Sequence, residues 1–182
     1  MTAESVRIRK AFLSDVSILQ ILGILTFREA FEAFNSAENM RMYIEKAFSD
    51  EQMIKELSNR NSEFYLAESG GEAIGYLKVN FGDAQTELHD SDGMEIERVY
   101  VLKQFYGKNV GKSLFEKAVE IALQRAKKYI WLGVWEENLR AINFYQKNGF
   151  REFGKHSFLL GTDEQTDLLM KLPIAKDPSL SN

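Results

Sequence analysis

A glycine-rich loop in front of a helical segment is the first stretch whose residue types suggest chemistry. It reads KQFYGKNVGKS over residues 103–113. Gly107 and Gly111 allow the backbone to approach a ligand closely, and a helix N-terminus offers unpaired N–H groups with a partial positive charge. Lys108 and Lys112 add positive charge. The spacing is that of neither a P-loop nor a dinucleotide fingerprint. The loop therefore predicts a pyrophosphate held by backbone amides, with a plain turn and helix cap as the alternative.

The segment 138–148 carries the second set of candidate residues, on a predicted helix that follows a buried, strand-like run. Asn138 and Tyr145 lie about two helical turns apart and so share one face. Ala141 and Ile142 lie between them, which leaves that face shallow and apolar. A ligand could lie along such a face, although a tyrosine in this setting is more often part of a core.

The elements that must position these residues alternate between strands and helices. Apolar runs with strand periodicity predict strands over residues 6–12, 62–69, 72–81, 94–102, 129–135, 150–161 and 166–174. Apolar residues at helical spacing predict helices over residues 16–34, 36–57, 109–127 and 138–148. Ser14 or Asp15 is expected to cap the first helix, and the second has a potential break near Ser49–Asp50. This order predicts a mixed α/β domain around one twisted sheet.

Composition excludes several classes of function. The 182 residues fit one domain, expected over residues 1–174, with a flexible polar tail at 175–182. A net charge of −4 disfavours a nucleic-acid partner and suits a cationic substrate. The lack of cysteine removes disulfides and thiolate catalysis, and His89 and His156 are too few for a zinc site, so no metal is expected. No apolar run approaches the roughly 20 residues of a membrane span, and the N-terminus lacks a signal-peptide pattern. We therefore expect a cytoplasmic protein.

The segment 94–127 resembles motif A of the GNAT superfamily of N-acetyltransferases. The loop of that family reads Gln/Arg-x-x-Gly-x-Gly/Ala, and the window here is Tyr106-Gly107-Lys108-Asn109-Val110-Gly111. Tyr106 replaces the Gln or Arg and cannot make its side-chain contact, and Asn109 replaces the central glycine. Asn is the non-glycine residue best able to adopt left-handed φ, so the turn is expected to survive.

The segment 129–150 resembles motif B of the same superfamily more strongly. The pattern N-x-x-A-x-x-F/L-Y-x-x-x-G-F is present as Asn138, Ala141, Phe144-Tyr145 and Gly149-Phe150. The two motifs together imply the GNAT fold. That fold is an α/β domain with a mixed sheet of about six to seven strands, four to five helices and a splayed pair of central strands.

In the GNAT family, the gap between the splayed strands holds acetyl-CoA as a co-substrate, and the resemblance implies a contact for each matching residue. The phosphate loop would bind the pyrophosphate through Tyr106, Gly107, Lys108, Asn109, Val110, Gly111 and Lys112. The main chain of Val99, Tyr100 and Val101 would hydrogen-bond the acetyl carbonyl and the pantetheine. Asn138 would bind the pantetheine amides, and Lys147 could contact the phosphates. Tyr145 would act as the general acid that protonates the departing thiolate.

Acetyl transfer to an amine needs a neutral nitrogen, which a nearby carboxylate can help to provide directly or through a water. Glu95 and Glu97 alternate on the strand 94–102 and are expected to point to one face, together with Val99. Glu97 is favoured as base or substrate anchor, and Glu95 is the alternate base. Under the alternative, they only form ion pairs, with Arg98, Arg140 or Lys128.

Over residues 5–173 the chain resembles the PaiA-type spermidine/spermine N-acetyltransferases of Gram-positive bacteria. The segments YLKVNFGDAQTE, EIERVYV and HSFLLGTDEQTDLLM carry this resemblance together with motif B. It implies a polyamine substrate, which the acidic loop 83–92 and the carboxylates Glu29 and Glu32 could attract. His156 and Ser157 could line the acceptor side.

Two other functions stay open at this point. The first keeps the chemistry and changes the acceptor to another amine, such as a protein N-terminus or an aminoglycoside. The second is an acetyl-CoA-binding regulatory protein, because the PaiA-type family is also linked to control of sporulation and degradative-enzyme genes. The sequence contains no helix-turn-helix pattern with a basic recognition face, so DNA binding is not expected. It does not decide between a monomer and a homodimer.

Overall fold

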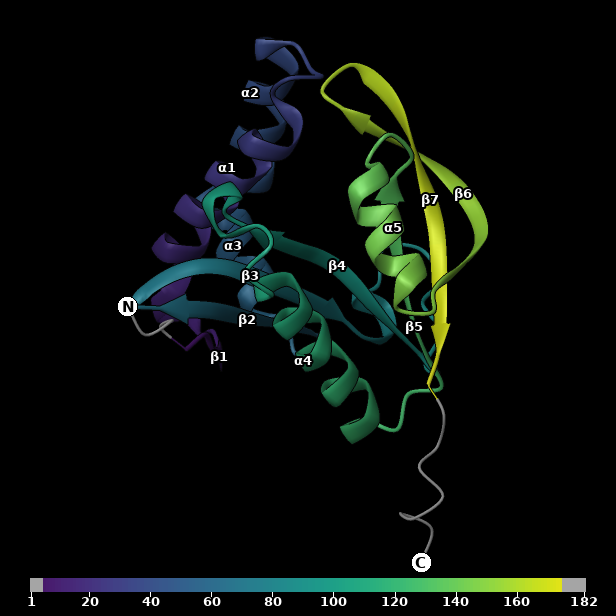
Figure 1. The fold of residues 1–182 in the computed structure, drawn as a ribbon. Coiled ribbons are helices and arrows are strands. Elements are labelled where there is room, and N and C mark those ends of the chain that lie inside the picture. The colour runs from purple at the N-terminus through teal and green to yellow at the C-terminus, as the bar shows by residue number, and fades with distance from the viewer. Residues whose placement is uncertain (1–4, 175–182) are drawn as a thin grey trace, which may run out of the picture.

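One seven-stranded mixed sheet organises residues 5–174, the part of the chain that this computed structural model describes (Figure 1). The order of strands across the sheet is β1-β2-β3-β4-β5-β7-β6. The strands are β1 (Arg7–Lys10), β2 (Ser62–Ser69), β3 (Glu72–Asn80), β4 (Gly93–Val101), β5 (Tyr129–Trp135), β6 (Arg151–Leu160) and β7 (Asp163–Pro173). The α-helices of this range are α1 (Val16–Phe31), α2 (Ala37–Ala47), α3 (Asp50–Ser58), α4 (Val110–Gln124) and α5 (Leu139–Lys147). The predicted mixed α/β class is confirmed, and the expected tail 175–182 lies outside the described residues.

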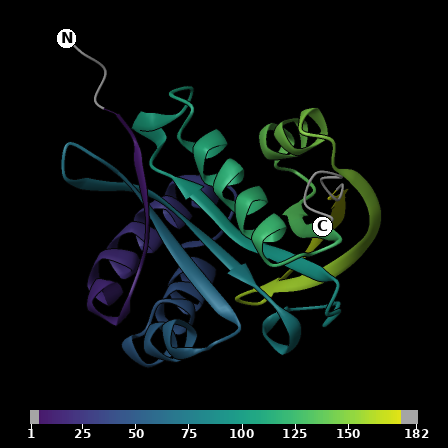
Figure 2. The ribbon, with the colours of Figure 1, turned by 90° about the horizontal axis from the view of Figure 1, so that it is seen from below.

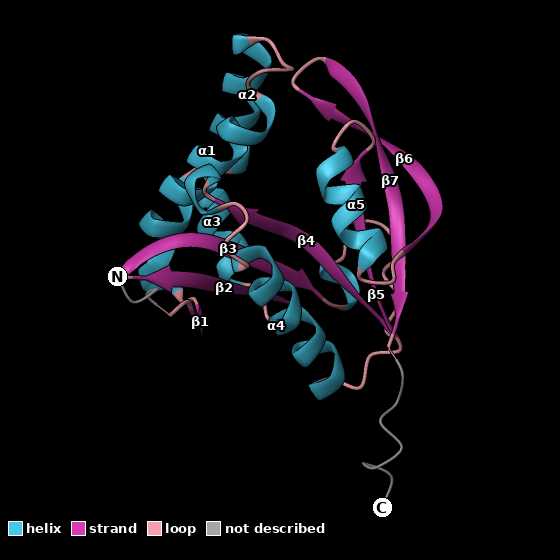
Figure 3. Cartoon of the chain, viewed as in Figure 1, coloured by secondary structure: helices cyan, strands magenta, loops and turns pink. Residues whose placement is uncertain are grey.

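The helices cover both faces of the sheet. Figure 2 shows α4 and α5 on one side and α1, α2 and α3 on the other, and Figure 3 shows the same layers coloured by secondary structure. The α1–α3 layer shares a buried apolar cluster with its face of the sheet, which includes Leu19, Phe27 and Tyr76. The α4–α5 layer shares a second cluster with the other face, which includes Leu114 and Phe150.

Two helix starts show how local sequence shapes the α1–α3 layer. Between α2 and α3, the Ser49 side chain accepts a hydrogen bond from the Gln52 N–H at 3.2 Å, and the predicted break is confirmed. A 3₁₀ turn (Leu13–Asp15) precedes α1, and Asp15 occupies the cap position without a capping hydrogen bond. The Asp15 carboxylate instead accepts hydrogen bonds from the Arg9 guanidinium at 2.8 and 2.9 Å. Asp15 Oδ2 also accepts a hydrogen bond from the Phe12 backbone N–H at 2.8 Å, across the 3₁₀ turn. The prediction that Ser14 or Asp15 caps α1 is therefore wrong, because Ser14 lies inside the 3₁₀ turn and the Asp15 carboxylate is engaged by Arg9 and Phe12.

The central strands β4 and β5 separate partway along their length. They are parallel neighbours that pair over Gly93–Glu95 and Tyr129–Trp131. Beyond these positions β4 continues to Val101 against β3, while β5 continues to Trp135 against β7. The two strands diverge, as Figure 1 shows, and the facing edge of each lacks a strand partner within residues 5–174. The predicted splayed pair is confirmed.

A β-bulge interrupts β4 beside this gap. Lys78 and Val79 are consecutive on β3, but they pair with Arg98 and Ile96 on β4. Glu97 is therefore an extra residue in β4, and an extra residue locally resets the alternation of side chains.

The bulge changes which residues share a face. Glu95 and Glu97 both accept hydrogen bonds from Asn80 Nδ2, so they lie on the same side of the sheet, as predicted. Val99 instead packs against the apolar cluster of the α4–α5 layer. The prediction that Val99 shares the face of the glutamates is wrong, because the extra residue is Glu97 itself and the bulge breaks the alternation between Glu97 and Val99.

The turn between β6 and β7 contacts α2 at the open end of the gap (Figure 1). Asn39 Oδ1 on α2 accepts hydrogen bonds from the Thr162 backbone N–H at 3.0 Å and from Thr162 Oγ1 at 3.2 Å. Gly161 has a φ of 66°, and a Cβ added there would collide with Asn39 Oδ1. This contact, the α2 clasp, joins the two sides of the gap and requires glycine at the turn.

Candidate active site

The glycine-rich loop forms an open cradle at the start of α4. Gly107 and Asn109 have positive φ values of 75° and 63°. Ser113 N–H donates to Asn109 O at 2.9 Å, so the amides just before Ser113 belong to the first helical turn, which has no intrahelical acceptors. A Cβ added at Gly107 or Gly111 would meet no atom within 4 Å, which leaves room for a ligand against the backbone. The predicted left-handed conformation of Asn109 is confirmed.

A cavity of about 300 Å³, the loop cavity, lies between this cradle and α5. Its lining includes the predicted loop residues Tyr106, Gly107, Asn109, Val110, Gly111 and Lys112. It also includes Arg140, whose guanidinium carbon lies 3.5 Å from the centroid of the Tyr106 ring. Tyr106 thus holds a cation beside the loop. Lys108 and Lys147 are exposed and lie outside the lining of this cavity.

A second cavity of about 400 Å³, the sheet cavity, lies on the face of the sheet that α1 and α2 cover. Four carboxylates line it: Glu87, Glu95, Glu97 and Asp167. Aromatic rings from both helices and from several strands surround them, among them Phe27, Tyr43, Trp135 and Phe158. Carboxylates attract cations, and ring faces bind them. The sheet cavity is therefore suited to a cationic ligand.

The two cavities meet in the gap between β4 and β5. The residues that line both are Val99, Tyr100, Asn138, Ala141 and Tyr145. The face of α5 predicted from the spacing of Asn138 and Tyr145 therefore lies where a ligand in one cavity would contact a ligand in the other.

Asn138 and Tyr145 have different environments on this face. Asn138 Oδ1 accepts a hydrogen bond from the Ala141 N–H at 3.1 Å and so caps α5, which leaves the Nδ2 group to donate to a ligand. Tyr145 is 9% exposed and packs edge-to-face against Phe150, with ring centroids 5.3 Å apart. Burial raises the pKa of Tyr145 to about 12. Its hydroxyl is therefore protonated at neutral pH and can donate a hydrogen bond.

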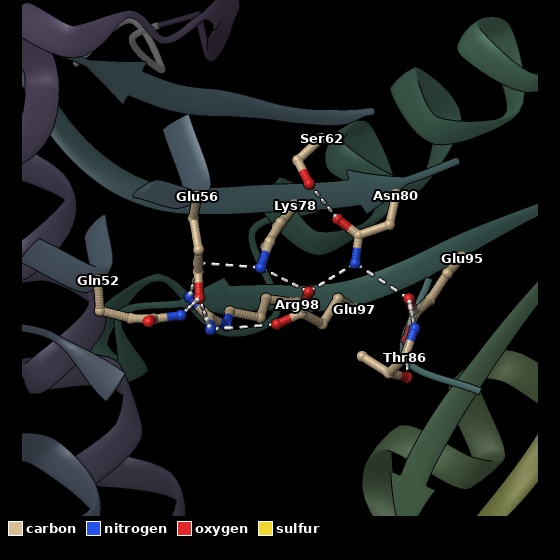
Figure 4. Close-up of polar contacts among 9 residues, drawn as sticks. All are labelled: Gln52, Glu56, Ser62, Lys78, Asn80, Thr86, Glu95, Glu97 and Arg98. Atoms are coloured by element: carbon tan, nitrogen blue, oxygen red, sulfur yellow. Dashed lines mark hydrogen bonds and ion pairs between the residues drawn. The ribbon is translucent and has the colours of Figure 1, made fainter. Parts of the chain in front are cut away.

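Glu97 lies in a buried ion network (Figure 4). Its carboxylate contacts Lys78 Nζ at 2.6 Å and Arg98 Nη2 at 3.1 Å, and both cations also contact Glu56 of α3, at 2.9 and 3.0 Å. Burial alone would raise the pKa of Glu97, but the charges of Arg98 and Lys78 outweigh it and lower the pKa to about 2. A carboxylate with so low a pKa is a weak proton acceptor. The geometry favours ion pairing with Arg98, which was the alternative for this residue.

Glu95 borders the same network but has different partners (Figure 4). Thr86 donates to Glu95 from its backbone N–H at 2.9 Å and from Oγ1 at 2.5 Å. Asn80 Nδ2 donates to Glu95 at 3.0 Å and to Glu97 at 2.6 Å. Burial raises the pKa of Glu95, and the hydrogen bonds from Thr86 and Asn80 only partly oppose the shift. Glu95 therefore binds a proton more readily than Glu97 does.

Asp167 and His156 are opposite each other on the paired strands β7 and β6, and both line the sheet cavity. Asp167 Oδ1 and His156 Nδ1 are buried without a hydrogen-bond partner in the described part of the chain. Burial raises the pKa of Asp167 to about 6, although the nearby His156 opposes the shift. His156 was a sequence candidate for the acceptor side. Asp167 was not, because a single Asp in the run TDLLM is indistinguishable from an ordinary strand residue.

Several other sequence candidates lie outside the sheet cavity. Ser157, Glu29 and Glu32 do not line it, and Glu29 instead accepts a hydrogen bond from the Lys103 backbone N–H at 2.8 Å. The acidic loop 83–92 contributes two lining residues, Thr86 and Glu87. Among residues 5–174, no cluster of three or more His, Asp or Glu side chains could hold a metal ion. No helix of that range is long and apolar enough to cross a membrane.

Comparison with known proteins assigns the family. A family model described as Acetyltransferase (GNAT) family matches residues 26–150. This chain belongs to the GNAT family. GNAT enzymes are N-acetyltransferases that use acetyl-CoA, and the resemblance inferred from the two motifs is confirmed at this level.

Individual relatives of the GNAT family extend this comparison. An uncharacterized N-acetyltransferase of Lactobacillus delbrueckii subsp. lactis is 43% identical over 146 residues, which cover 80% of this chain and 84% of that protein. A spermidine N(1)-acetyltransferase of Thermoplasma acidophilum is 24% identical over 151 residues, which cover 81% and 89% of the two chains. The crystal structure of the PaiA N-acetyltransferase from Thermoplasma acidophilum in complex with coenzyme A has a TM-score of 0.76 at 22% identity, covering 93% of this chain and 99% of that one. The structural likeness shows that the two proteins share the GNAT fold.

Proposed function

We propose that this GNAT enzyme acetylates a primary amine of a polyamine such as spermidine or spermine, by direct attack on acetyl-CoA in a ternary complex. The observation that carries the proposal is the pair of cavities on opposite faces of the sheet, which meet at Tyr145. With this arrangement a thioester can enter from one face and an amine from the other. The similarity to a relative named spermidine N(1)-acetyltransferase supports the choice of acceptor.

The loop cavity has the features that acetyl-CoA requires. The open backbone at Gly107 and Gly111, at the start of α4, suits a pyrophosphate. Arg140 adds positive charge on the opposite wall. The unpaired edge of β4 at residues 99–101 offers N–H and C=O groups to the pantetheine amides, and Asn138 Nδ2 is a further donor. When bound there, acetyl-CoA would supply an activated acetyl group.

In the proposed reaction, the neutral amine nitrogen attacks the thioester carbonyl carbon and the C–S bond then breaks. Tyr145 would act as the general acid by donating its hydroxyl hydrogen to a hydrogen bond with the departing sulfur. The pKa of Tyr145 is about 12, against roughly 8.5 for a thiol. Complete proton transfer is therefore uphill, and the main contribution of Tyr145 is a hydrogen bond to the developing thiolate.

The proton released by the amine needs an acceptor in the sheet cavity or a water path to solvent. Glu95 suits this role better than Glu97, because burial raises the pKa of Glu95 whereas two cations hold Glu97 ionised. We therefore propose Glu95 as the base, acting directly or through a water, and Glu97 as the fixed anion whose ion pairs hold the bulge in place.

The acceptor would occupy the sheet cavity. A polyamine carries several ammonium groups separated by methylene segments, and this cavity combines four carboxylates with aromatic walls. Glu97 is already paired with Lys78 and Arg98, so Glu87 and Asp167 are the carboxylates that can pair with the ammonium groups. Ring faces pack against methylenes and cations. A cytoplasmic location agrees with this proposal, because it would supply both acetyl-CoA and polyamine, and cell fractionation would test it. Light scattering would decide between a monomer and a homodimer.

A substrate panel tests the proposal. The purified protein is given acetyl-CoA with spermidine, spermine, putrescine, a peptide with a free N-terminus or an aminoglycoside, and the released thiol is measured. We expect the highest kcat/KM for a polyamine. Turnover of the peptide or the aminoglycoside alone would overturn the polyamine proposal and keep the chemistry. Binding of acetyl-CoA without turnover of any amine would favour the regulatory function instead.

A further inference from the structure

Two buried acceptor atoms of the sheet cavity stand without a partner in residues 5–174: Asp167 Oδ1 and His156 Nδ1. Native proteins rarely bury polar atoms unpaired, so such atoms call for an explanation. His156 Nε2 lies 3.5 Å from Glu87 Oε1, which favours the tautomer with its proton on Nε2. In that tautomer Nδ1 carries a lone pair. The pair Asp167 and His156 therefore presents two acceptors and no donor to the cavity.

The surroundings of Asp167 leave space for a ligand atom. Asp167 pairs in register with Trp135 of β5, which also lines the sheet cavity. A Cβ added at Gly133 would lie 3.1 Å from Asp167 Oδ2, so the carboxylate extends across β5 where that strand has no side chain. An alkylammonium group has three N–H donors and no acceptor. Such a group can donate hydrogen bonds to both the Asp167 carboxylate and the His156 Nδ1 lone pair, and its methylenes can pack against the aromatic wall.

We propose that Asp167, assisted by His156, binds the ammonium group of the acceptor that is not acetylated, and thereby selects amines with a second cationic nitrogen. This inference rests on the proposed function. A carboxylate beside an amine favours the charged form of that amine, which suits an anchoring nitrogen and opposes attack by a reacting one. Asp167 is therefore a specificity-determining residue rather than the base. Tyr145 lines the same cavity, so the far end of an anchored acceptor lies toward the reaction centre.

The anchor should depend on pH. The titratable groups that face Asp167 are His156 on β6, Tyr100 on β4 and Tyr43 on α2, with Glu87 beyond His156. Burial raises the pKa of Asp167 to about 6. Asp167 becomes ionised as the pH rises through that value, so the KM for a diamine should fall over the same range.

The test compares matched acceptors on Asp167→Asn, namely putrescine against butylamine and cadaverine against pentylamine. Loss of a charge-assisted hydrogen bond should lower kcat/KM for the diamines by roughly 10- to 100-fold, mostly through KM. The value for each monoamine should change by less than about twofold on the same scale. The KM for acetyl-CoA should stay constant, and the diamine KM should lose its pH dependence near 6. Glu164→Gln, which removes an exposed charge from the same strand outside the cavity, is the control.

Each outcome supports or overturns the assignment. Equal losses for diamines and monoamines would give Asp167 a catalytic or structural role, and unchanged diamine kinetics would remove it from the site. If the wild-type protein does not use monoamines, the KM values of Asp167→Asn for spermidine and for acetyl-CoA are compared instead. A rise in the spermidine KM at a constant acetyl-CoA KM supports the assignment, and a constant spermidine KM overturns it. Gly133→Ala, which crowds the carboxylate and keeps its charge, should raise the diamine KM as well. Failure of the proposed function is recognised separately, because wild-type protein would then turn over no polyamine at all.

Discussion

The loop cavity and the sheet cavity are assembled in different ways. Most of the loop cavity comes from one continuous stretch, residues 99–112, closed by one face of α5, and its ligand-facing groups are largely backbone amides. The sheet cavity draws side chains from α1, α2, α5, four strands and the loop around Glu87. A site made of backbone tolerates many substitutions as long as the backbone conformation survives. A site made of side chains from distant positions can change its ligand with a single substitution. Recognition of the donor should therefore be robust, and recognition of the acceptor easily altered.

The largest effect is expected where the two cavities meet. Tyr145→Phe should lower kcat by roughly 10²- to 10³-fold, because the hydrogen bond to the departing sulfur is lost. The KM for acetyl-CoA should stay within about twofold, since the ring is retained and the loop cavity is untouched. Tyr129→Phe, whose hydroxyl contacts Asp90 away from both cavities, is the matched control. A kcat equal to that of the control would exclude Tyr145 as the acid.

The second prediction tests whether Glu97 stabilises the fold rather than acting as the base. Glu97→Gln should lower the free energy of unfolding at pH 7 by about 3 kcal/mol, because Lys78 and Arg98 lose a buried counter-ion. The pKa of Glu97 is lowered from 4.5 to about 2, so the stability that it contributes is present above pH 4.5 and lost as the pH falls toward 2. Denaturant titration at several pH values measures this difference.

The kinetic control for Glu97 is the pH profile of kcat. The acidic limb should persist in Glu97→Gln, moved only to lower pH because the charge of Glu97 no longer raises the pKa of Glu95, whereas Glu95→Gln should abolish it. Loss of the acidic limb in the Glu97 variant, with the limb retained in Glu95→Gln, would restore Glu97 as the base and remove Glu95 from that role.

A smaller effect is expected in the loop cavity, where one side chain adds to the backbone cradle. Arg140→Ala should raise the KM for acetyl-CoA by roughly 5- to 10-fold, which corresponds to about 1 kcal/mol. Tyr106→Ala should have a similar effect because it removes the ring that holds Arg140, and the double variant should be little worse than either single one. Arg28→Ala on α1 is the control. Additive effects would show that Tyr106 and Arg140 act independently.

The smallest effect is a gain in the stability of the fold on substitution of Asp167. Asp167→Asn should stabilise the fold by about 1 kcal/mol at pH 8, after allowance for partial exposure of the carboxylate. The raised pKa of Asp167 means that its ionisation costs stability as the pH rises from 3.8 to about 6. The gain should vanish below pH 4, and thermal unfolding at pH 4 and pH 8 measures it. A variant less stable than wild type at pH 8 would mean that Asp167 has a structural partner.

The loop cavity was largely predictable because its determinants are local. A strand, a glycine at 107, a residue able to adopt left-handed φ at Asn109 and an amphipathic helix follow one another without interruption. Asn138 and Tyr145 were predictable for the same reason, since helical geometry fixes their common face. The contact between Arg140 and Tyr106 was missed, although the absence of Gln or Arg at position 106 is a signal that another cation has to serve the loop.

The sheet cavity was only partly predictable because its determinants are long-range. Glu56 lies on α3 and reaches Glu97 only through the two cations, which no sequence pattern indicates. The bulge at Glu97 depends on the register of β4 against β3. The residue pattern of β4 still alternates, so the sequence does not indicate this register. Asp167 became a candidate because its buried Oδ1 has no hydrogen-bond partner in residues 5–174. Only the folded structure reveals this property.

The α2 clasp makes the gap between β4 and β5 an opening that is closed at both ends. Strand pairing at Glu95 closes one end, and the contact between Asn39 and Thr162 closes the other. A thin, unbranched amine can be threaded through such an opening end first, whereas a bulky molecule can enter only after α2 and the β6–β7 turn separate. That separation breaks hydrogen bonds that contribute on the order of 1–3 kcal/mol together. Under the proposed function, a single asparagine remote from the reacting atoms would thus limit the size of the acceptor.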